Sequence, residues 1–234
     1  MTPISLVLLP GMDGTGLLFE PLIGELPRAI NPVIISYPLN QPLTYRELLP
    51  IILEALPKHD PFILVGESFS GPLALMAAAQ GLSNLKAVIL CASFIQNPIP
   101  WLPKWAGVLA RGGLFRLSRR FIMAKALIAG YATPRLMGLL DKVHSSVSPA
   151  VMALRAREIL AVDVTAELKR CPVPVFYLGG ENDRVVSRGN LKMIKRIRPS
   201  VQARLIPGPH LILQTKPQES SEAICAFIRE LNPP

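Results

Sequence analysis

The sequence predicts an α/β domain: a mostly parallel sheet of six strands with helices on both faces, plus a helical cap. Three observations support this fold class. The chain has 234 residues and half of them are hydrophobic, which suits one domain with a large core. Short apolar runs alternate with helical patterns along most of the chain. One of these runs leads through a glycine-flanked serine directly into an Ala/Leu-rich segment, as in a strand–turn–helix unit.

The expected strands are rich in Val, Ile and Leu without alternation, because both faces of a parallel sheet are covered. They lie at about 4–9, 33–37, 62–66, 87–92, 174–179 and 202–206. Helical patterns follow them near 18–26, 44–57, 69–81, 188–198 and 217–231. Many of the 24 prolines stand at the predicted strand ends, so they separate elements rather than form a proline-rich linker.

The alternation stops between residues 99 and 160, where apolar residues recur every three or four positions. We therefore expect a core formed by residues 1–98 and 161–234 and a helical cap formed by 99–160. The cap follows the fourth strand, whose carboxyl end faces the site crevice of an open parallel sheet, so it is positioned to cover that crevice. Aromatic residues of the cap either line an acyl pocket or pack the cap onto the core; they are Trp101, Trp105, Phe115, Phe121 and Tyr131.

The positive charge is concentrated in the same segment. Residues 100–160 contain ten basic and two acidic side chains, and so carry +8 of the net +9. The rest of the chain is close to neutral, which argues against a nucleic-acid partner. A basic cap over a site entrance favours an anionic substrate, an acidic carrier or an anionic lipid surface, with Arg116, Arg119 and Arg120 as candidate contacts.

The three cysteines, Cys91, Cys171 and Cys225, are too few and too scattered for a disulfide framework or a metal site. Each lies in an apolar context and is interpreted as a buried thiol, which suits a reducing compartment. The first residues contain an apolar run without a preceding basic residue or a cleavage-site pattern. We therefore expect a cytoplasmic protein.

The strand–turn–helix unit places Ser68 at a sharp turn within Gly66-Glu67-Ser68-Phe69-Ser70-Gly71. A serine at such a turn has its hydroxyl lifted clear of the sheet and lies over the first N–H groups of a helix, which suits a nucleophile. The pattern departs from G-x-S-x-G because Ser70 stands where the second glycine is usual. Serine is small enough for that position.

A serine nucleophile needs a base that is oriented by a third group. We expect His210 as the base, because it follows the last strand and so lies at the same sheet edge as Ser68. His59 lies in a polar turn at the opposite edge, and His144 lies in the cap.

The expected acid is Asp183, which follows the fifth strand, with Glu181 as the alternative. Asp163 precedes that strand and is interpreted as a turn residue.

An acyl-transfer intermediate needs two aimed donors for its oxyanion. The candidates are the backbone N–H of Phe69, directly after the nucleophile, and that of Met12, in the loop Leu9–Gly16 after the first strand. Glycines at 11, 14 and 16 reverse the order of a dinucleotide-binding fingerprint, and no acidic residue ends the second strand, so we do not expect a dinucleotide there.

The order Ser68, Asp183, His210 around this turn resembles the α/β-hydrolase superfamily over nearly the whole chain. The resemblance includes a Leu-Pro-Gly loop after the first strand, where many relatives have His-Gly. It is strongest with small capped carboxylesterases, such as the pimeloyl-acyl-carrier-protein methyl ester esterases. It implies Ser68 as nucleophile, His210 as base and Asp183 as acid, with the Met12 and Phe69 N–H groups as oxyanion hole and no metal or other cofactor. It also implies a minimal six-stranded sheet.

The predicted function is therefore a carboxylic-ester hydrolase that forms an acyl-enzyme on small short- to medium-chain acyl esters. Two alternatives stay open. The first is an esterase or thioesterase that acts on acyl groups carried by acidic acyl carrier protein, which the basic cap would bind. The second is a membrane-surface or partner-binding module that retains the hydrolase fold.

Overall fold

A computed structural model describes residues 4–99, 127–128 and 130–231 of the chain. Six strands form one sheet in the order β2-β1-β3-β4-β5-β6, and all five neighbouring pairs are parallel. The strands are β1 (Ile4–Leu9), β2 (Ile30–Ile34), β3 (Phe62–Glu67), β4 (Leu85–Cys91), β5 (Val175–Gly180) and β6 (Gln202–Ile206). The predicted α/β class with a six-stranded parallel sheet is confirmed, and the helical cap stays a prediction.

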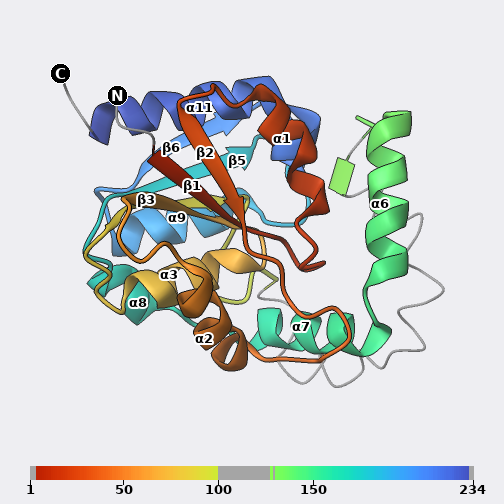
Figure 1. Ribbon diagram of the computed structural model, residues 1–234, viewed down its shortest axis with the longest axis horizontal. Helices are drawn as coiled ribbons and strands as arrows, with labels where there is room; N and C mark the ends of the chain where they lie inside the picture. Colours follow the sequence, from red (N-terminus) through yellow and green to blue (C-terminus); the bar gives the residue numbers. More distant parts are fainter. Residues whose placement is uncertain (1–3, 100–126, 129, 232–234) are drawn as a thin grey trace.

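Helices cover both faces of the sheet (Figure 1). One face carries α1 (Glu20–Glu25), which follows the short 3-10 helix η1 (Leu17–Phe19), and α10 (Ile212–Thr215) and α11 (Pro217–Leu231). The opposite face carries α2 (Tyr45–Ala55), α3 (Ser70–Ala78), α8 (Thr165–Arg170) and α9 (Arg188–Ile197).

Two apolar layers hold these helices to the sheet. Successive residues of a strand point to opposite faces, so Leu6 and Leu8 pack under α1 and α11 while Val7 and Leu9 pack under α2 and α3. All four side chains are fully buried. This is why the strands are continuously apolar and show no alternation in the sequence.

The second strand differs from the expected range of about 33–37, because it covers Ile30–Ile34. The chain leaves the sheet after Ile34, and the Tyr37 N–H then donates to the Gly14 carbonyl at 2.8 Å instead of to a strand. Pro32 is tolerated inside β2 because this is an edge strand, where one row of backbone groups needs no partner. Helices α8 and α10 were not expected, since segments this short have little periodicity.

Two further helices lie in the segment expected to be helical after the fourth strand: α6 (Pro134–Ser146) and α7 (Pro149–Ala161). Side chains cap both of them, because Thr133 accepts a hydrogen bond from the Leu136 N–H and Ser148 accepts one from the Val151 N–H. They stand beside the carboxyl ends of the strands (Figure 1). The boundaries 99–160 of a cap stay a prediction.

No helix in the described ranges is long and apolar enough to cross a lipid bilayer.

Candidate active site

Ser68 occupies a strained turn between β3 and α3. Its φ angle is 48°, one of two non-glycine residues with positive φ in the described part of the chain. Gly66 and Gly71, on either side of this turn, have no room for a side chain. A Cβ at Gly66 would lie 2.4 Å from the Ser70 carbonyl oxygen, and a Cβ at Gly71 would lie 1.9 Å from the Ser93 Oγ. The strand and the helix therefore approach as closely as the sequence predicts.

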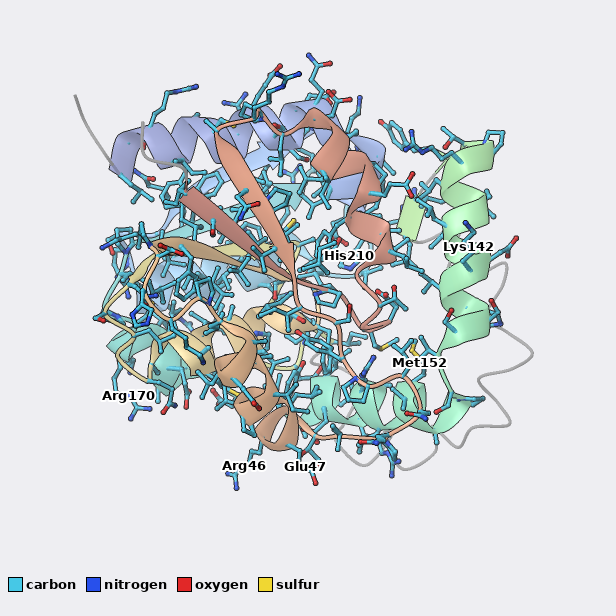
Figure 2. The ribbon with its side chains drawn as sticks, in the orientation of Figure 1. Arg46, Glu47, Lys142, Met152, Arg170 and His210 are labelled. Atoms are coloured by element: carbon cyan, nitrogen blue, oxygen red, sulfur yellow. The ribbon has the colours of Figure 1, made fainter. Side chains whose placement is uncertain are left out.

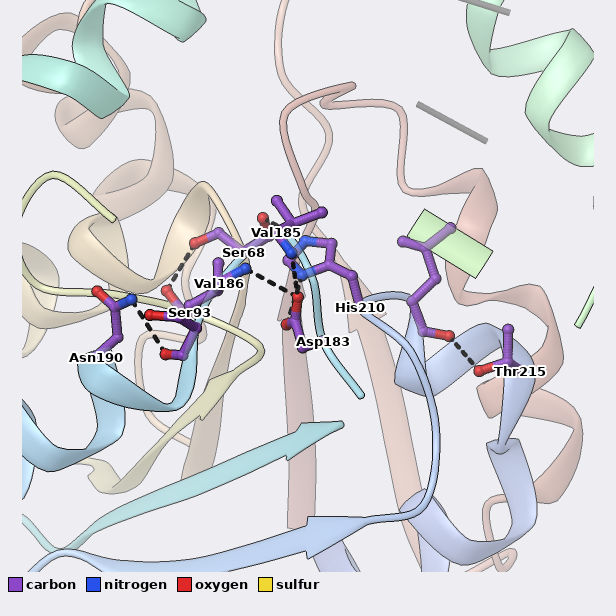
Figure 3. A network of polar contacts seen from close by, with 10 residues as sticks. Ser68, Ser93, Asp183, Val185, Val186, Asn190, His210 and Thr215 are labelled. Carbon is purple, nitrogen blue, oxygen red and sulfur yellow. Dashed lines mark hydrogen bonds and ion pairs between the residues drawn. The ribbon is translucent and has the colours of Figure 1, made fainter. Parts of the chain in front are cut away.

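Hydrogen bonds from the neighbouring strand hold this turn. The Ser68 N–H donates to the Cys91 carbonyl at 2.8 Å. The Ser93 Oγ donates to the Ser68 carbonyl at 2.6 Å (Figure 3). Both partners lie at or just after the end of β4. Ser93, which sequence reasoning missed, fixes the backbone of the turn while leaving the Ser68 hydroxyl free for other contacts.

The structure brings the three predicted side chains together. The His210 Nε2 lies 3.0 Å from the Ser68 Oγ, and the His210 Nδ1 lies 2.8 Å from the Asp183 Oδ2 (Figure 3). His210 and Asp183 are 3% and 4% exposed, so water screens their interaction little. An imidazole bonded in this way carries its proton on Nδ1 and presents Nε2 to the serine hydroxyl.

Asp183 is held by its own loop. Its Oδ1 accepts hydrogen bonds from the N–H groups of Val185 and Val186, both at 2.8 Å, which leaves Oδ2 for the histidine. Glu181, the alternative acid, is exposed. Asp163 lies in a turn, where it accepts from the Thr165 N–H at 3.0 Å, as expected for a turn residue.

The two predicted oxyanion donors come from the start of α3 and from the loop after β1. Phe69 is fully buried at the start of α3, and Met12 lines the cavity described below. Within the described residues, neither backbone N–H donates to another protein group. Both N–H groups therefore lack an acceptor within the described part of the protein.

Ser70, at the position where glycine is usual, has a role that the sequence did not predict. Its hydroxyl donates to the Pro10 carbonyl and lies 2.6 Å from the Tyr37 hydroxyl. A serine has one proton to donate, so the Tyr37 hydroxyl is the donor in the second bond. The extra oxygen of Ser70 thus joins the helix after the nucleophile to the loop after β1.

Glu67, the residue before the nucleophile, is a buried carboxyl group at the same site. It is 3% exposed, and its Oε1 accepts a hydrogen bond from the Gln214 Nε2 at 2.8 Å. Burial raises the pKa of Glu67 to about 7, although the Gln214 amide acts in the opposite direction. The sequence gives no sign of this, because a Glu in a G-x-S motif looks like any variable position.

A cavity of about 270 Å³ opens in front of Ser68 and His210. Its walls are mostly apolar and include Phe94 and Ile99 after β4, Leu140 of α6 and Met152 of α7. Figure 2 shows Met152 on the side of α7 that is turned toward His210. The Asp13, Asp141 and His144 side chains also reach the cavity wall.

Most of the predicted cap contacts cannot be placed, because Trp101, Trp105, Phe115, Phe121, Arg116, Arg119 and Arg120 lie outside the described residues. Tyr131 is described. It is 39% exposed, is not part of the described cavity wall, and has the Lys216 ammonium 5.5 Å from its ring centre. Its role in the cap stays a prediction.

Two of the ten basic residues in the segment 100–160, Arg155 and Arg135, contact the core. Arg155 is 1% exposed and binds backbone carbonyls, so its charge does not lie on the surface. The Arg135 Nε lies 3.0 Å from the Glu20 Oε1, so its charge is paired with the core.

A sequence model of the alpha/beta hydrolase family matches residues 6–223. The chain belongs to this family. The matched region includes nearly the whole described sheet and the residues Ser68, Asp183 and His210.

One relative is similar in sequence over part of the chain. It is the chloroplastic phytyl ester synthase 1 of Arabidopsis thaliana, which is 34% identical over 109 residues. The match covers 42% of this chain and 16% of that protein's length.

Solved structures are similar over the whole fold. A bromoperoxidase from Bacillus anthracis is 18% identical with a TM-score of 0.83, over 97% of this chain and 92% of that one. A structure from a study of carboxylesterases of Nitrososphaera gargenis is 18% identical with a TM-score of 0.80, over 98% and 91%. At this identity the likeness concerns the fold. Esterases are among these structural neighbours.

Proposed function

We propose that this protein is a carboxylic-ester hydrolase that works through an acyl-enzyme on Ser68. The observation that carries the proposal is the chain of contacts from the Ser68 Oγ through His210 to Asp183, at 3.0 and 2.8 Å, at the wall of an apolar cavity. Nucleophile, base and orienting acid are within hydrogen-bond reach of one another, which is what this chemistry requires.

In the proposed first step, the His210 Nε2 takes the Ser68 hydroxyl proton while the oxygen attacks the ester carbonyl carbon. The carbonyl oxygen becomes an oxyanion, which the N–H groups of Met12 and Phe69 stabilise. The tetrahedral intermediate then expels the alkoxide, which leaves as the alcohol by taking the proton from His210. Asp183 stays ionised and stabilises the imidazolium in between.

Water completes the cycle by the same route. His210 takes a proton from water as its oxygen attacks the acyl-serine carbonyl, and returns that proton to the Ser68 oxygen as the acid leaves. Each step needs only groups of this chain, the ester and water. We propose that the apolar cavity walls receive the acyl chain, since ligand pockets of this size are lined mainly by apolar side chains.

Labelling with a fluorophosphonate tests the proposal, because such a probe reacts with activated serines. We expect one label, on Ser68, and none in Ser68→Ala. That variant is expected to remain folded, and its kcat should be about 10⁴–10⁶-fold lower than that of the wild type, as when a triad serine is removed. A label on Ser70, or turnover that survives in Ser68→Ala, would overturn the assignment. A series of p-nitrophenyl esters from acetate to palmitate then defines the preferred chain length.

Acyl transfer to an alcohol is the second candidate, and the similarity to a phytyl ester synthase favours it. The same acyl-enzyme would then be attacked by an alcohol instead of water. The two functions differ in product. Adding a long-chain alcohol to the reaction should yield a new ester at the expense of free acid if transfer occurs, and should leave the yield of free acid unchanged if the protein only hydrolyses.

Binding of an acyl carrier protein or an anionic membrane at a basic cap also remains a proposal. Neutralising Arg116, Arg119 and Arg120 together should lower kcat/KM for a carrier-bound substrate at low salt and leave a neutral ester nearly unaffected. Equal losses for both substrates at every salt concentration would remove the basis for it.

A further inference from the structure

Arg155 of α7 is the most unusual charged residue among those described. It is 1% exposed, although arginine is rarely buried without an acidic partner. No carboxylate of the described residues forms a salt bridge with it. Instead the Nη1 donates to the carbonyls of Met12 at 3.0 Å and Asp13 at 2.9 Å, and the Nη2 donates to the Pro38 carbonyl at 3.0 Å.

The core has a space shaped for this guanidinium group. Gly14 has φ 73°, and a Cβ there would lie 2.5 Å from the Nη1, so only glycine leaves the group room. The guanidinium carbon lies 5.5 Å from the centre of the Tyr37 ring and 5.9 Å from the centre of the Phe69 ring. The residue that supplies one predicted oxyanion donor, Phe69, is therefore itself in contact with Arg155.

Burial of this charge has a cost. The Arg155 Nε has no hydrogen-bond partner in the described residues, and burial lowers the pKa of the guanidinium. An apolar side chain of α7 could fill the same volume without this cost. The three carbonyl bonds are what distinguish Arg155 from such a residue, and two of them go to the loop after β1.

The loop after β1 carries Met12, the other predicted oxyanion donor, and four successive carbonyls of this loop accept hydrogen bonds. The Pro10 carbonyl accepts from the Ser70 hydroxyl, and the Gly11 carbonyl accepts from the Gly14 N–H at 3.0 Å. The Met12 and Asp13 carbonyls accept from Arg155. Because a trans peptide is planar, the Met12 N–H points opposite to the Gly11 carbonyl. The Asp13 carbonyl and the Gly14 N–H belong to one planar peptide. The bond from Arg155 to that carbonyl therefore also holds the N–H that binds the Gly11 carbonyl.

We propose that Arg155 is a positioning residue that holds the Met12 N–H in its oxyanion-binding direction, so that the oxyanion hole depends on the docking of helix α7. The inference rests on the proposed ester hydrolysis. A second contact supports the docking: the Glu158 Oε2 accepts from the Tyr45 N–H at 2.8 Å, one turn further along α7. Helix α7 is thus joined to the core both at the oxyanion loop and at the start of α2.

The test compares Arg155→Met with Arg157→Met, in which an exposed arginine of the same helix is removed. Hydrolysis of p-nitrophenyl butyrate is measured together with the affinity for a trifluoromethyl ketone, which forms an oxyanion on the serine, and for the corresponding methyl ketone, which models the ground state. Arg155→Met should lower kcat about 10²–10³-fold, the effect of losing one oxyanion donor. KM should change little, and the loss of affinity should be confined to the trifluoromethyl ketone. Arg157→Met should match the wild type in all three.

A structural anchor without this role would give a different result. Affinity for both ketones would then fall equally, or kcat would stay within about threefold of the wild type, and either outcome overturns the inference. If Arg155→Met does not fold, Arg155→Lys is measured instead, because the compact ammonium lacks the planar fork that reaches all three carbonyls. It should show the same selective loss, and kcat like the wild type would contradict the inference. Failure of the proposed ester hydrolysis can be distinguished from failure of this inference, because the wild type itself would then lack turnover and Ser68 labelling.

Discussion

The turn that carries Ser68 and the loop that carries Met12 lie at the same cavity but are held in opposite ways. The Ser68 turn is held by close backbone packing at Gly66 and Gly71 and by bonds to residues at the end of β4. The loop after β1 is held by side chains that come from α3 and α7, Ser70 and Arg155. The nucleophile is therefore built into the core of the fold, whereas the oxyanion loop depends on distant elements.

The largest expected effect separates the acid from its neighbour. Asp183→Asn should lower kcat about 10³–10⁴-fold, because the amide no longer holds the histidine tautomer or stabilises the imidazolium. Glu181→Gln, at an exposed position of the same loop, should leave kcat within about twofold. Steady-state kinetics of both variants provide the ranking, and the reverse order would place the acid at 181.

The close packing of the Ser68 turn can be tested by adding one methyl group. Gly66→Ala would place a Cβ 2.4 Å from one backbone oxygen and 2.8 Å from the Gly71 Cα, neither of which can move aside. We expect a loss of about 3 kcal/mol or more in the free energy of unfolding by urea. Gly24→Ala in α1, with nothing within 4 Å, is the matched control and should be neutral or stabilising. Similar stability of both variants would show that the turn is not sterically fixed.

Glu67 makes the stability of the Ser68 turn depend on pH. Its folded pKa of about 7 lies above the ordinary value of 4.5, so the folded state binds the proton more tightly than the unfolded state. The stability linked to this group is complete below pH 4.5 and is lost as the pH rises toward 7, by up to about 3 kcal/mol.

Urea unfolding at several pH values measures this dependence. Glu67→Gln should flatten the fall between pH 4.5 and 7, while Glu54→Gln, at an exposed position of α2, should leave it unchanged. An unaltered slope in Glu67→Gln would mean that the buried carboxyl is not the group responsible.

The smallest expected effect concerns the contact between the two regions. Ser70→Ala removes the hydroxyl that binds the Pro10 carbonyl and accepts from Tyr37, and leaves both buried groups without this partner. We expect a loss of about 1–3 kcal/mol in stability and a roughly tenfold lower kcat, since the loop after β1 is held less firmly. Ser200→Ala, an exposed serine, serves as the control. An unchanged kcat in Ser70→Ala would mean that α3 does not position the loop.

The same contrast explains how much could be predicted from the sequence. Ser68, Asp183 and His210 were predictable because each follows a buried strand, and the carboxyl ends of parallel strands share one edge. Gly66 and Gly71 were predictable for the same local reason. Arg155, Ser70 and Gln214 were not, because their partners lie far away in the sequence and nothing local distinguishes them from a surface arginine, a small helix residue or a polar side chain. The second strand was misplaced because the apolar run continues past the point where the chain leaves the sheet.

The most direct test of the proposed chemistry is to observe the acyl group on the protein. The wild type is mixed rapidly with p-nitrophenyl butyrate, quenched in acid during turnover, and digested for peptide mass spectrometry. We predict a single butyryl group on the peptide that contains Ser68, located on that residue by fragmentation, and no butyryl group on this peptide in Ser68→Ala. Turnover without any acylated serine, or acylation of a different residue, would contradict the proposed mechanism.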